Sequence, residues 1–475
     1  MELEKLIISE NATIIDGLIL ISENSYGICF IVDKSKKILG TLSDGDIRRH
    51  LIKGRGTKEN ICTAMNPDFV SLPVNTKSEI IRAKYSSELK FIPLLDSSGK
   101  VVDVVNAKEN HRISILEPCF TNNETIYLMD CIKSGWVSSN GKYVRRFEEE
   151  FSKWHDNAYT IATSSGTSAL HLCLTTLGIT EGDDVLVPDL TFAATVNSVL
   201  YCNATPVLVD IDEEKWCINL QGIKKARTEK TRAIIVVHLY GQMPNMQEIQ
   251  DYCEEEDLLL IEDCAESIGS KYMNKKSGLF GHAAAFSFFG NKTITTGEGG
   301  MAIFKSKKAS QLAKKLRDHG MDTEKRYWHD VVGYNYRMTN MQAALGVAQI
   351  EQLSNIIEKK LAIMDAYNKL LKGKCYVKKL PFAAPNVIHS NWLYTIMIDI
   401  ESIDILSTNM LSKGVEIRRV FYPLHLMPPY QSYGNAENMQ NSIKLAKYGI
   451  SLPSSASLSL NQLSYIVENL DECLS

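Results

Sequence analysis

The chain has 475 residues, 44% apolar and 23% charged, which is the balance of a globular protein and excludes a disordered or fibrous one. The formal net charge of −4 excludes a global positive field that would attract nucleic acid or anionic lipid. Apolar runs such as Gly17–Ile21 are too short to span a bilayer, and Met1–Glu10 carries interleaved charges instead of an export signal. We therefore expect a soluble protein of about three compact units.

The eleven cysteines are at least eleven residues apart, so the short paired spacings of a zinc site or a redox CxxC motif are absent. We expect most of them to be small buried hydrophobic residues in a reducing compartment. The expected location is the cytoplasm.

The first 112 residues are rich in short β-type runs separated by turns. Two β-turn-β units, Cys29–Gly40 and Phe91–Asp103, resemble each other and lie about sixty residues apart, which predicts a duplicated module. Two unrelated hairpins with a similar turn are the alternative. The expected strands are Gly27–Val32, Lys37–Leu42, Phe69–Leu72, Lys90–Leu95 and Lys100–Val105.

The segment Gly40–Arg49 places a serine and two acids between a strand and the expected helix Ile47–Ile52, where backbone amides can hold a phosphate and a carboxylate can hold ribose hydroxyls. It resembles the nucleotide-binding signature of CBS-domain pairs. The resemblance implies that Ser43 contacts phosphate and Asp46 contacts ribose of a regulatory nucleotide. The second copy, Asp103–Glu109, lacks the glycine and the hydroxyl residue, so at most one site is expected. Alternatively, Ser43 or Asp44 only caps the helix, in a domain that serves only assembly.

From Leu116 onward, longer helices alternate with buried strands, which predicts right-handed crossovers and a mainly parallel sheet with both faces covered. A long helical pattern, Asn340–Leu371, then leads to a smaller C-terminal segment. The expected helices are Lys142–Trp154 and Ala169–Leu177, and the expected strands are Asp184–Pro188, Thr205–Asp210, Ala233–His238 and Leu258–Asp263.

Four segments of this region carry residues suited to chemistry, each where a strand or turn meets a helix. Thr163–Leu170 places Gly166, Thr167 and hydroxyl side chains at a helix start, which predicts a phosphate cup, although a simple cap has a similar sequence. An apolar strand delivers Asp263 at its carboxyl end, where the acid could face a protonated pyridine nitrogen or merely cap the next helix. Lys292 follows Ser287 by five residues and precedes a glycine-rich turn.

A lysine held beside a cationic ring has a lowered pKa, so its amine can attack an aldehyde and later act as a base, although most lysines are solvated loop charges.

The fourth segment, Gly333–Ala344, clusters Asn335, Arg337 and Thr339 before the long helix. Contact with an anion and capping of the helix are both possible roles for these residues.

Together, the cup, the aspartate and the lysine have the order and spacing of fold-type I pyridoxal phosphate enzymes. From about Leu116 to about Leu470 the sequence more closely resembles the DegT/DnrJ/EryC1/StrS family of nucleotide-sugar aminotransferases. Further motifs that carry the resemblance are Gly135–Ser139, Pro188–Thr195, His238–Gln242 and Phe421–His425.

The resemblance implies a role for each matching residue. Lys292 bonds covalently to the pyridoxal phosphate, Asp263 pairs with the pyridine nitrogen, and Phe192 stacks on the ring. Gly166, Thr167 and Ser287 hold the phosphate, helped by Asn335 or Arg337 of a neighbouring subunit, so at least a homodimer is expected. Glu266 faces the ring hydroxyl and is typical of the perosamine-synthase-like branch. Trp136, Ser138, Arg337, Tyr422 and His425 are candidates for gripping the sugar nucleotide; for Tyr422 and His425, packing in the core is the alternative.

The resulting hypothesis is an α/β aminotransferase with three parts: a CBS-domain pair at 1–112, a cofactor-binding large domain at 113–365 and a small domain at 366–475. It moves the amino group of glutamate to the keto carbon, preferably C4, of a nucleotide-linked 4-keto-6-deoxyhexose used for surface-polysaccharide synthesis. No metal is expected. The rival hypotheses are a sugar dehydratase on the same scaffold and a nucleotide-sensing regulator with a vestigial catalytic half; Lys292 argues against the first.

Overall fold

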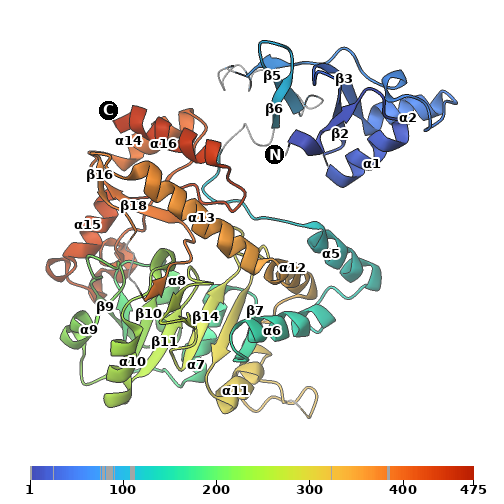
Figure 1. The fold of residues 1–475 in the computed structure, drawn as a ribbon. Helices are drawn as coiled ribbons and strands as arrows, with labels where there is room; N and C mark the ends of the chain where they lie inside the picture. Colours follow the sequence, from blue (N-terminus) through green and yellow to red (C-terminus); the bar gives the residue numbers. More distant parts are fainter. Residues whose placement is uncertain are drawn as a thin grey trace. The chain divides into compact units, whose positions relative to one another are not determined.

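The computed structural model describes residues 3–24, 26–74, 76, 81, 89, 91–106, 113–322, 324–381 and 386–474. Contacts divide the chain into two compact units, Met1–Ile113 and Ser114–Ser475 (Figure 1). All eleven cysteines are free thiols. Among the described helices, none is both long and apolar enough to cross a membrane.

The first unit contains two three-stranded sheets with the same topology. In each sheet the first strand pairs in parallel with the second, and the second pairs antiparallel with the third, with a register shift at the equivalent place in the hairpin. The two hairpin turns meet at an antiparallel bridge between Lys37 and Lys100. This repetition agrees with a duplicated module. The elements are β1 (Ile7–Ser9), α1 (Ile14–Asn24), β2 (Ile28–Val32), β3 (Ile38–Ser43), α2 (Asp44–Ile52), β4 (Leu72–Pro73), β5 (Phe91–Leu95) and β6 (Val101–Asn106).

The second unit is built on a seven-stranded sheet with the order β7-β15-β14-β11-β10-β8-β9. The strands from β14 to β9 run parallel, whereas β15 is antiparallel to both of its neighbours. The prediction of a mainly parallel sheet is therefore confirmed. The strands are β7 (Tyr159–Thr163), β8 (Asp184–Pro188), β9 (Thr205–Val209), β10 (Thr231–Val237), β11 (Leu259–Asp263), β14 (Ala283–Ser287) and β15 (Gly300–Phe304).

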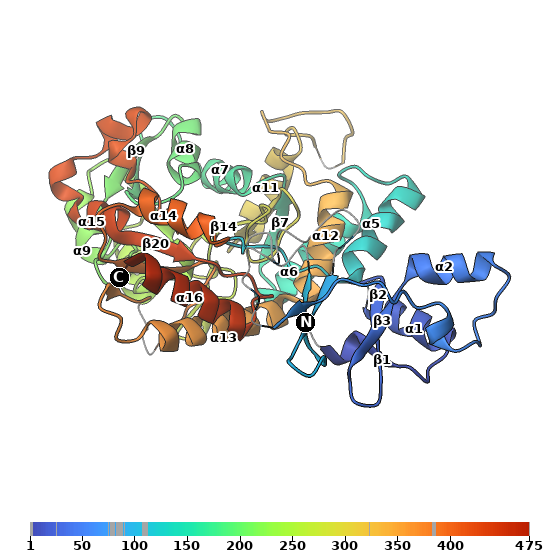
Figure 2. The ribbon, with the colours of Figure 1, turned by 90° about the horizontal axis from the view of Figure 1, so that it is seen from above.

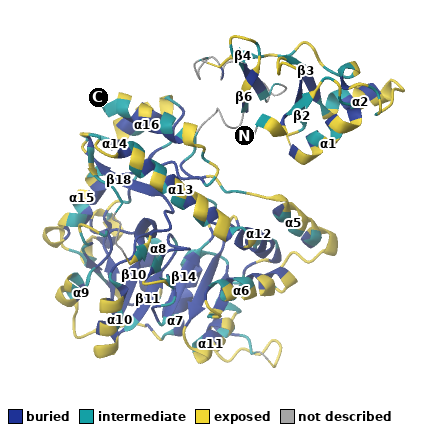
Figure 3. Ribbon diagram, in the orientation of Figure 1, coloured by how far each residue is buried: buried dark blue, intermediate teal, exposed yellow. Residues whose placement is uncertain are grey.

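Helices cover both faces of this sheet because successive strand residues point to opposite sides. Ala283 and Ala285 of β14 pack with helices α7 (Gly166–Thr176), α8 (Ala194–Tyr201) and α11 (Lys307–Arg317). Ala284 and Phe286 pack on the other face with α6 (Lys142–Trp154) and α12 (Asn340–Glu351). Farther along that second face lie α9 (Leu220–Ala226) and α10 (Met246–Glu255). The strands are accordingly the most deeply buried part of the unit (Figure 3).

The C-terminal part of the second unit has its own antiparallel sheet, ordered β16-β18-β20-β19. Helix α13 (Leu353–Leu371) leads to this sheet and lies beside α16 (Leu460–Leu474) (Figure 2). The sheet strands are β16 (Val377–Lys379), β18 (Tyr394–Ile398), β19 (Arg418–Arg419) and β20 (Gly449–Leu452), accompanied by α14 (Ile403–Ser412) and α15 (Gln440–Tyr448). The remaining elements include α5 (Asn122–Ser134) and the short strands β12 (Lys271–Tyr272), β13 (Lys275–Lys276) and β17 (Val387–Ile388).

Two sequence predictions of elements are wrong. The helical pattern 340–371 is not one helix, because α12 ends at Glu351 and α13 begins at Leu353. Helix α12 packs on α5 and α6, whereas α13 packs on α16, so the packing partners of the chain change at Gln352. A hydrophobic repeat in the sequence does not show such a change. The run 69–72 contributes only Leu72 to a strand, which continues to Pro73.

Candidate active site

The residues of the predicted phosphate cup lie at the start of α7, which is a capped helix start. Ser165 is the N-cap, and its Oγ accepts the backbone N–H of Ser168 at 3.1 Å. Gly166 and Thr167 follow as the first helical residues, whose amides have no carbonyl partner within a helix. A Cβ on Gly166 would come within 2.7 Å of the Ser287 Cβ, so only glycine lets the helix start approach the end of β14 this closely. Helix capping and a ligand-facing turn thus occur together here.

A cavity of about 420 Å³ opens in front of this cup. It is formed at the carboxyl ends of the parallel strands, where open α/β sheets bind their ligands. The sequence-predicted residues that line it are Gly166, Thr167, Phe192, Asp263, Glu266, Ser287 and Lys292. The structure therefore brings together seven of the eight expected cofactor contacts.

Asp263 lies at the end of β11, in the wall of the cavity. Its Oδ2 accepts the hydroxyl of Thr195 at 2.8 Å, and its Oδ1 accepts the backbone N–H of Ala265 at 3.1 Å. Burial raises the pKa of the carboxyl, and these two hydrogen bonds oppose that rise. A carboxylate in this setting is stabilised further by a cationic partner, such as a protonated ring nitrogen.

Lys292 and Glu266 form a close buried pair, with Nζ 3.6 Å from Oε1. Burial lowers the pKa of Lys292, and the nearby charges of Glu266 and Asp263 raise it in part. Burial also raises the pKa of Glu266 to about 7, against the opposing effect of Lys292. Both groups are thus shifted toward their neutral forms, and a neutral amine is the nucleophilic form of lysine. The expected lowering of the lysine pKa is already produced by burial, without a cationic ring.

Sequence reasoning predicted Phe192 at the site but missed the row of aromatic side chains to which it belongs, three of which line the cavity (Phe192, Phe421 and Trp392). The aromatic row consists of Phe192, Phe421, Tyr240 and Trp392, with successive ring centroids 6.0, 5.7 and 5.9 Å apart. Tyr240 has a left-handed backbone (φ 54°), which is costly for an aromatic residue. This conformation lets its N–H donate to Glu266 Oε2 at 2.8 Å while its ring stacks between Trp392 and Phe421.

The other end of the row reaches the lysine. Lys292 Nζ lies 3.8 Å from the centroid of the Trp392 ring, and Trp392 Nε1 donates to the carbonyl of Asn291 at 2.7 Å. Arg418 of β19 also lines the cavity, as a second cation besides Lys292, and it too was missed. The neighbouring motif at 421–425 was the available signal, since Arg418 precedes it by only three residues.

Five expected ligand contacts lie outside the cavity lining of this single chain. The carbonyls of Trp136 and Ser138 accept hydrogen bonds from Asn340. Arg337 forms an ion pair with Asp318 at 3.0 Å, and Tyr422 is bonded to Arg419. His425 is buried, with Nδ1 2.8 Å from Asp189 Oδ2, as its packed alternative expected.

Asn335 is the eighth expected cofactor contact, and in this chain it pairs with Asp318 in an isolated β-bridge. It was expected to reach the site of a neighbouring subunit. Its role, like those of Arg337 and the other four residues outside the cavity, stays a prediction.

In the first unit, Ser43 and Asp46 bond to each other. The Ser43 hydroxyl donates to Asp46 Oδ2 at 2.6 Å, the Asp46 N–H donates back to Ser43 Oγ, and Arg49 pairs with the same carboxylate. This is a capping box at the start of α2, the alternative that the sequence left open. A nucleotide contact by these side chains stays a prediction. The equivalent stretch of the second copy, Asp103–Glu109, is described only as far as Asn106, and 107–109 lie outside the described residues.

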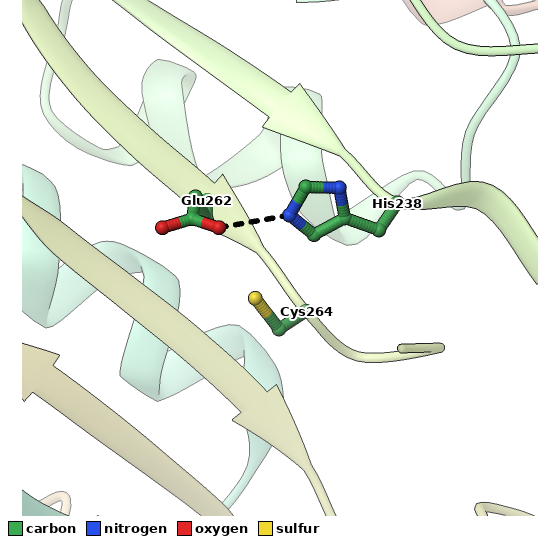
Figure 4. A group of neighbouring side chains, drawn as sticks. All are labelled: His238, Glu262 and Cys264. Atoms are coloured by element: carbon green, nitrogen blue, oxygen red, sulfur yellow. Dashed lines mark hydrogen bonds and ion pairs between the residues drawn. The ribbon is translucent and has the colours of Figure 1, made fainter. Parts of the chain in front are cut away.

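A second polar cluster, His238, Glu262 and Cys264, lies beside the site at the ends of β10 and β11 (Figure 4). It has the side-chain types of a metal site, but the Glu262 carboxylate is already fully engaged. Its oxygens accept the backbone N–H groups of Gly278, Phe280 and Gly281, and its Oε2 lies 2.9 Å from His238 Nε2. We assign this cluster to the support of β11, which carries Asp263.

An open α/β sheet with a phosphate cup, a buried aspartate and a buried lysine in one cavity defines the class of fold-type I pyridoxal phosphate enzymes. The donor set fits that cofactor: helix-start amides for the phosphate, an acid for the ring nitrogen and an amine for the aldehyde.

The particular family follows from sequence. Residues 118–471 match the model of the DegT/DnrJ/EryC1/StrS aminotransferase family, and the chain belongs to that family. Residues 3–53 match the CBS domain model; they belong to the first copy of the duplicated module in the first unit. The family and fold expected from the sequence are confirmed.

Relatives and solved structures agree with this assignment. The chain is 42% identical to a GDP-perosamine synthase of Escherichia coli O157:H7, over 76% of this chain and 98% of the relative. It is also 42% identical to a GDP-perosamine synthase of Vibrio cholerae, over 76% of this chain and 100% of the relative. Among solved structures, the PLP-form of the putative sugar aminotransferase Spr1654 from Streptococcus pneumoniae matches with a TM-score of 0.70 at 25% identity, covering 77% of this chain and 100% of that one.

Proposed function

We propose that this protein is a pyridoxal phosphate-dependent aminotransferase that moves the amino group of glutamate to C4 of a GDP-linked 4-keto-6-deoxyhexose. The observation that carries the proposal is the buried Lys292 amine, which shares one cavity with Asp263 and the start of α7. The choice of GDP and of C4 is supported by relatives named GDP-perosamine synthase, which are 42% identical over nearly their full length.

The bound cofactor supplies an electron sink for the carbon that loses or gains a proton. Lys292 would hold the cofactor through its aldehyde, and its amine is placed to move the proton at the substrate carbon. Asp263, held by Thr195 and Ala265, keeps the ring nitrogen protonated, and Phe192 covers the ring. Gly166, Thr167 and Ser287 bind the phosphate, and Glu266 faces the ring hydroxyl.

Arg418 is suited to the amino donor. Arg418 lines the cavity, and Glu416 Oε1 accepts from one edge of its guanidinium, through Nε at 3.1 Å and Nη2 at 3.0 Å. A guanidinium oriented in this way favours a carboxylate, and glutamate brings two carboxylates into the site. We assign Arg418 to one of them, and the exposed Tyr422, which follows the cavity-lining Phe421 in the chain, to the sugar nucleotide.

The assembly follows from the residues that the single chain leaves outside its own cavity. Asn335 or Arg337 of one subunit complete the phosphate site of the other in a homodimer, within a cytoplasmic pathway of polysaccharide synthesis. The first unit binds a regulatory nucleotide at Ser43 and Asp46, which requires the capping box to open toward the ligand.

The test uses nitrogen-15-labelled glutamate with GDP-, UDP-, dTDP- and CMP-linked 4-keto sugars, read by mass. The expected result is labelled amino sugar from the GDP substrate. K292A should give no product and should lose the yellow adduct that borohydride reduces, while K359M, a change on the exposed face of α13, should retain both. Turnover by K292A at the wild-type rate would refute the assignment, and product without label would favour a dehydratase.

A further inference from the structure

Lys360 is a buried lysine that has no role in the proposed reaction. It lies on α13 with 1% of its surface exposed. Among the described carboxylates, none forms an ion pair with its Nζ, and burial lowers its pKa to about 7. Burying an amine is costly unless it is hydrogen-bonded, and a methionine would fill a similar volume at no such cost. The amine therefore has a use beyond packing.

The Lys360 amine donates hydrogen bonds to two backbone carbonyls from different segments. Nζ donates to the carbonyl of Trp392 at 3.1 Å and to the carbonyl of Ser454 at 2.7 Å. These carbonyls belong to the segment before β18 and to the segment after β20, which the amine ties to α13. The same turn of α13 is tied a second time, because Asn391 Nδ2 donates to the carbonyl of Lys360 at 3.3 Å.

Trp392 is the aromatic residue whose ring contacts the amine of Lys292. Its ring centroid is 3.8 Å from Lys292 Nζ, and its indole N–H donates to Asn291, the residue before the lysine. Trp392 is 5% exposed and stacks on Tyr240, so a displacement of its backbone also affects the residue that holds Glu266.

We propose that Lys360 is a positioning residue, whose amine fixes the Trp392 backbone so that the indole covers Lys292 and limits its access to water. The chain of contacts runs from the Lys360 amine to the Trp392 carbonyl, through the indole, to the Lys292 amine. The inference deepens the proposed function, since it assigns the environment of the lysine on which that function rests.

The test measures how fast Lys292 itself is acetylated in the full-length protein, by peptide mass, after bound carbonyl compounds have been removed with hydroxylamine. K360M should speed acetylation of Lys292 roughly five- to tenfold, the factor expected for the loss of about one net hydrogen bond that holds the cover in place. K359M, at the exposed neighbouring position of the same helix, is the matched control and should leave the rate unchanged.

A double-mutant cycle separates positioning from general loosening. W392L should speed the acetylation of Lys292 by itself, and K360M added to W392L should have no further effect, because the route through the indole is already gone. A folded K360M with the wild-type rate would overturn the proposal, and so would an equal gain from K360M in both backgrounds.

K360Q, which keeps a donor group, replaces K360M if that variant does not fold. Loss of folding in both would also overturn the proposal, since Lys360 would then support the whole core and not one wall of the site. Acetylation does not depend on catalysis, so failure to bind pyridoxal phosphate would refute the proposed function and leave this comparison intact.

Discussion

The buried amine of Lys360 makes the stability of the second unit depend on pH in a way that K360M should remove. The pKa of this group falls from 10.5 in the unfolded chain to about 7 in the folded one. Between these values the unfolded chain binds the proton and the folded chain does not, so stability rises with pH. At about 1.4 kcal/mol per pKa unit, the full cost is about 5 kcal/mol below pH 7, and it vanishes as pH approaches the unfolded pKa.

The assay is urea unfolding at pH 7.5 and 9.5, followed by tryptophan emission. All five tryptophans lie in the second unit, so the signal reports on that unit alone. The free energy of unfolding of wild type relative to K360M should rise by about 2.5 kcal/mol between the two pH values. Wild type relative to K359M should stay constant, because that lysine is exposed. A wild-type-to-K360M difference that is flat with pH would refute the reasoning that the amine is neutral in the folded protein.

Three changes at the cavity have separate expected results. G166A should weaken binding of pyridoxal phosphate about tenfold or more in an absorbance titration, since the new Cβ lies 2.7 Å from the Ser287 Cβ; unchanged affinity would exclude a close approach at the cup. D263N should lower kcat by about a hundredfold or more while the reducible adduct with Lys292 still forms, and near-normal kcat would mean that the ring nitrogen has no acidic partner. R418K should raise KM for glutamate about tenfold and leave KM for the sugar nucleotide unchanged, because lysine cannot form the planar fork; a rise in the sugar KM would reassign Arg418.

The sequence was informative wherever the chemistry is local. The cup could be predicted because its glycine, hydroxyls and following helix are adjacent in the chain, and Asp263 because an apolar strand ends on it. That the cup residues and Asp263 lie close together also follows from the parallel strands, because the carboxyl ends of such strands meet at one edge of the sheet. A helix cap at Ser43 is among the alternatives that the sequence offers, since the capping box that forms there spans only four residues.

The remainder depended on contacts between distant segments. The aromatic row joins residues from four separate segments, and nothing near Trp392 in the chain indicates that its ring lies against Lys292. Lys360 occupies a helical position that sequence alone assigns to either face. The break at Gln352 is a change of packing partner, which a hydrophobic repeat cannot show.

The place of β15 in the large sheet has a consequence for synthesis of the chain. Strand β15 lies between β7 and β14, and its Gly300 pairs with Thr163, more than a hundred residues earlier. A Cβ on Gly300 would overlap the Ser165 carbonyl, so this strand forms part of the wall behind the cup. A nascent chain that has not yet released residue 304 from the ribosome therefore lacks both the pairing of β7 and the strand that packs against Ser165 at the start of α7. The chain should therefore bind the cofactor only after residue 304 has been released, so cofactor binding would mark a completely assembled sheet.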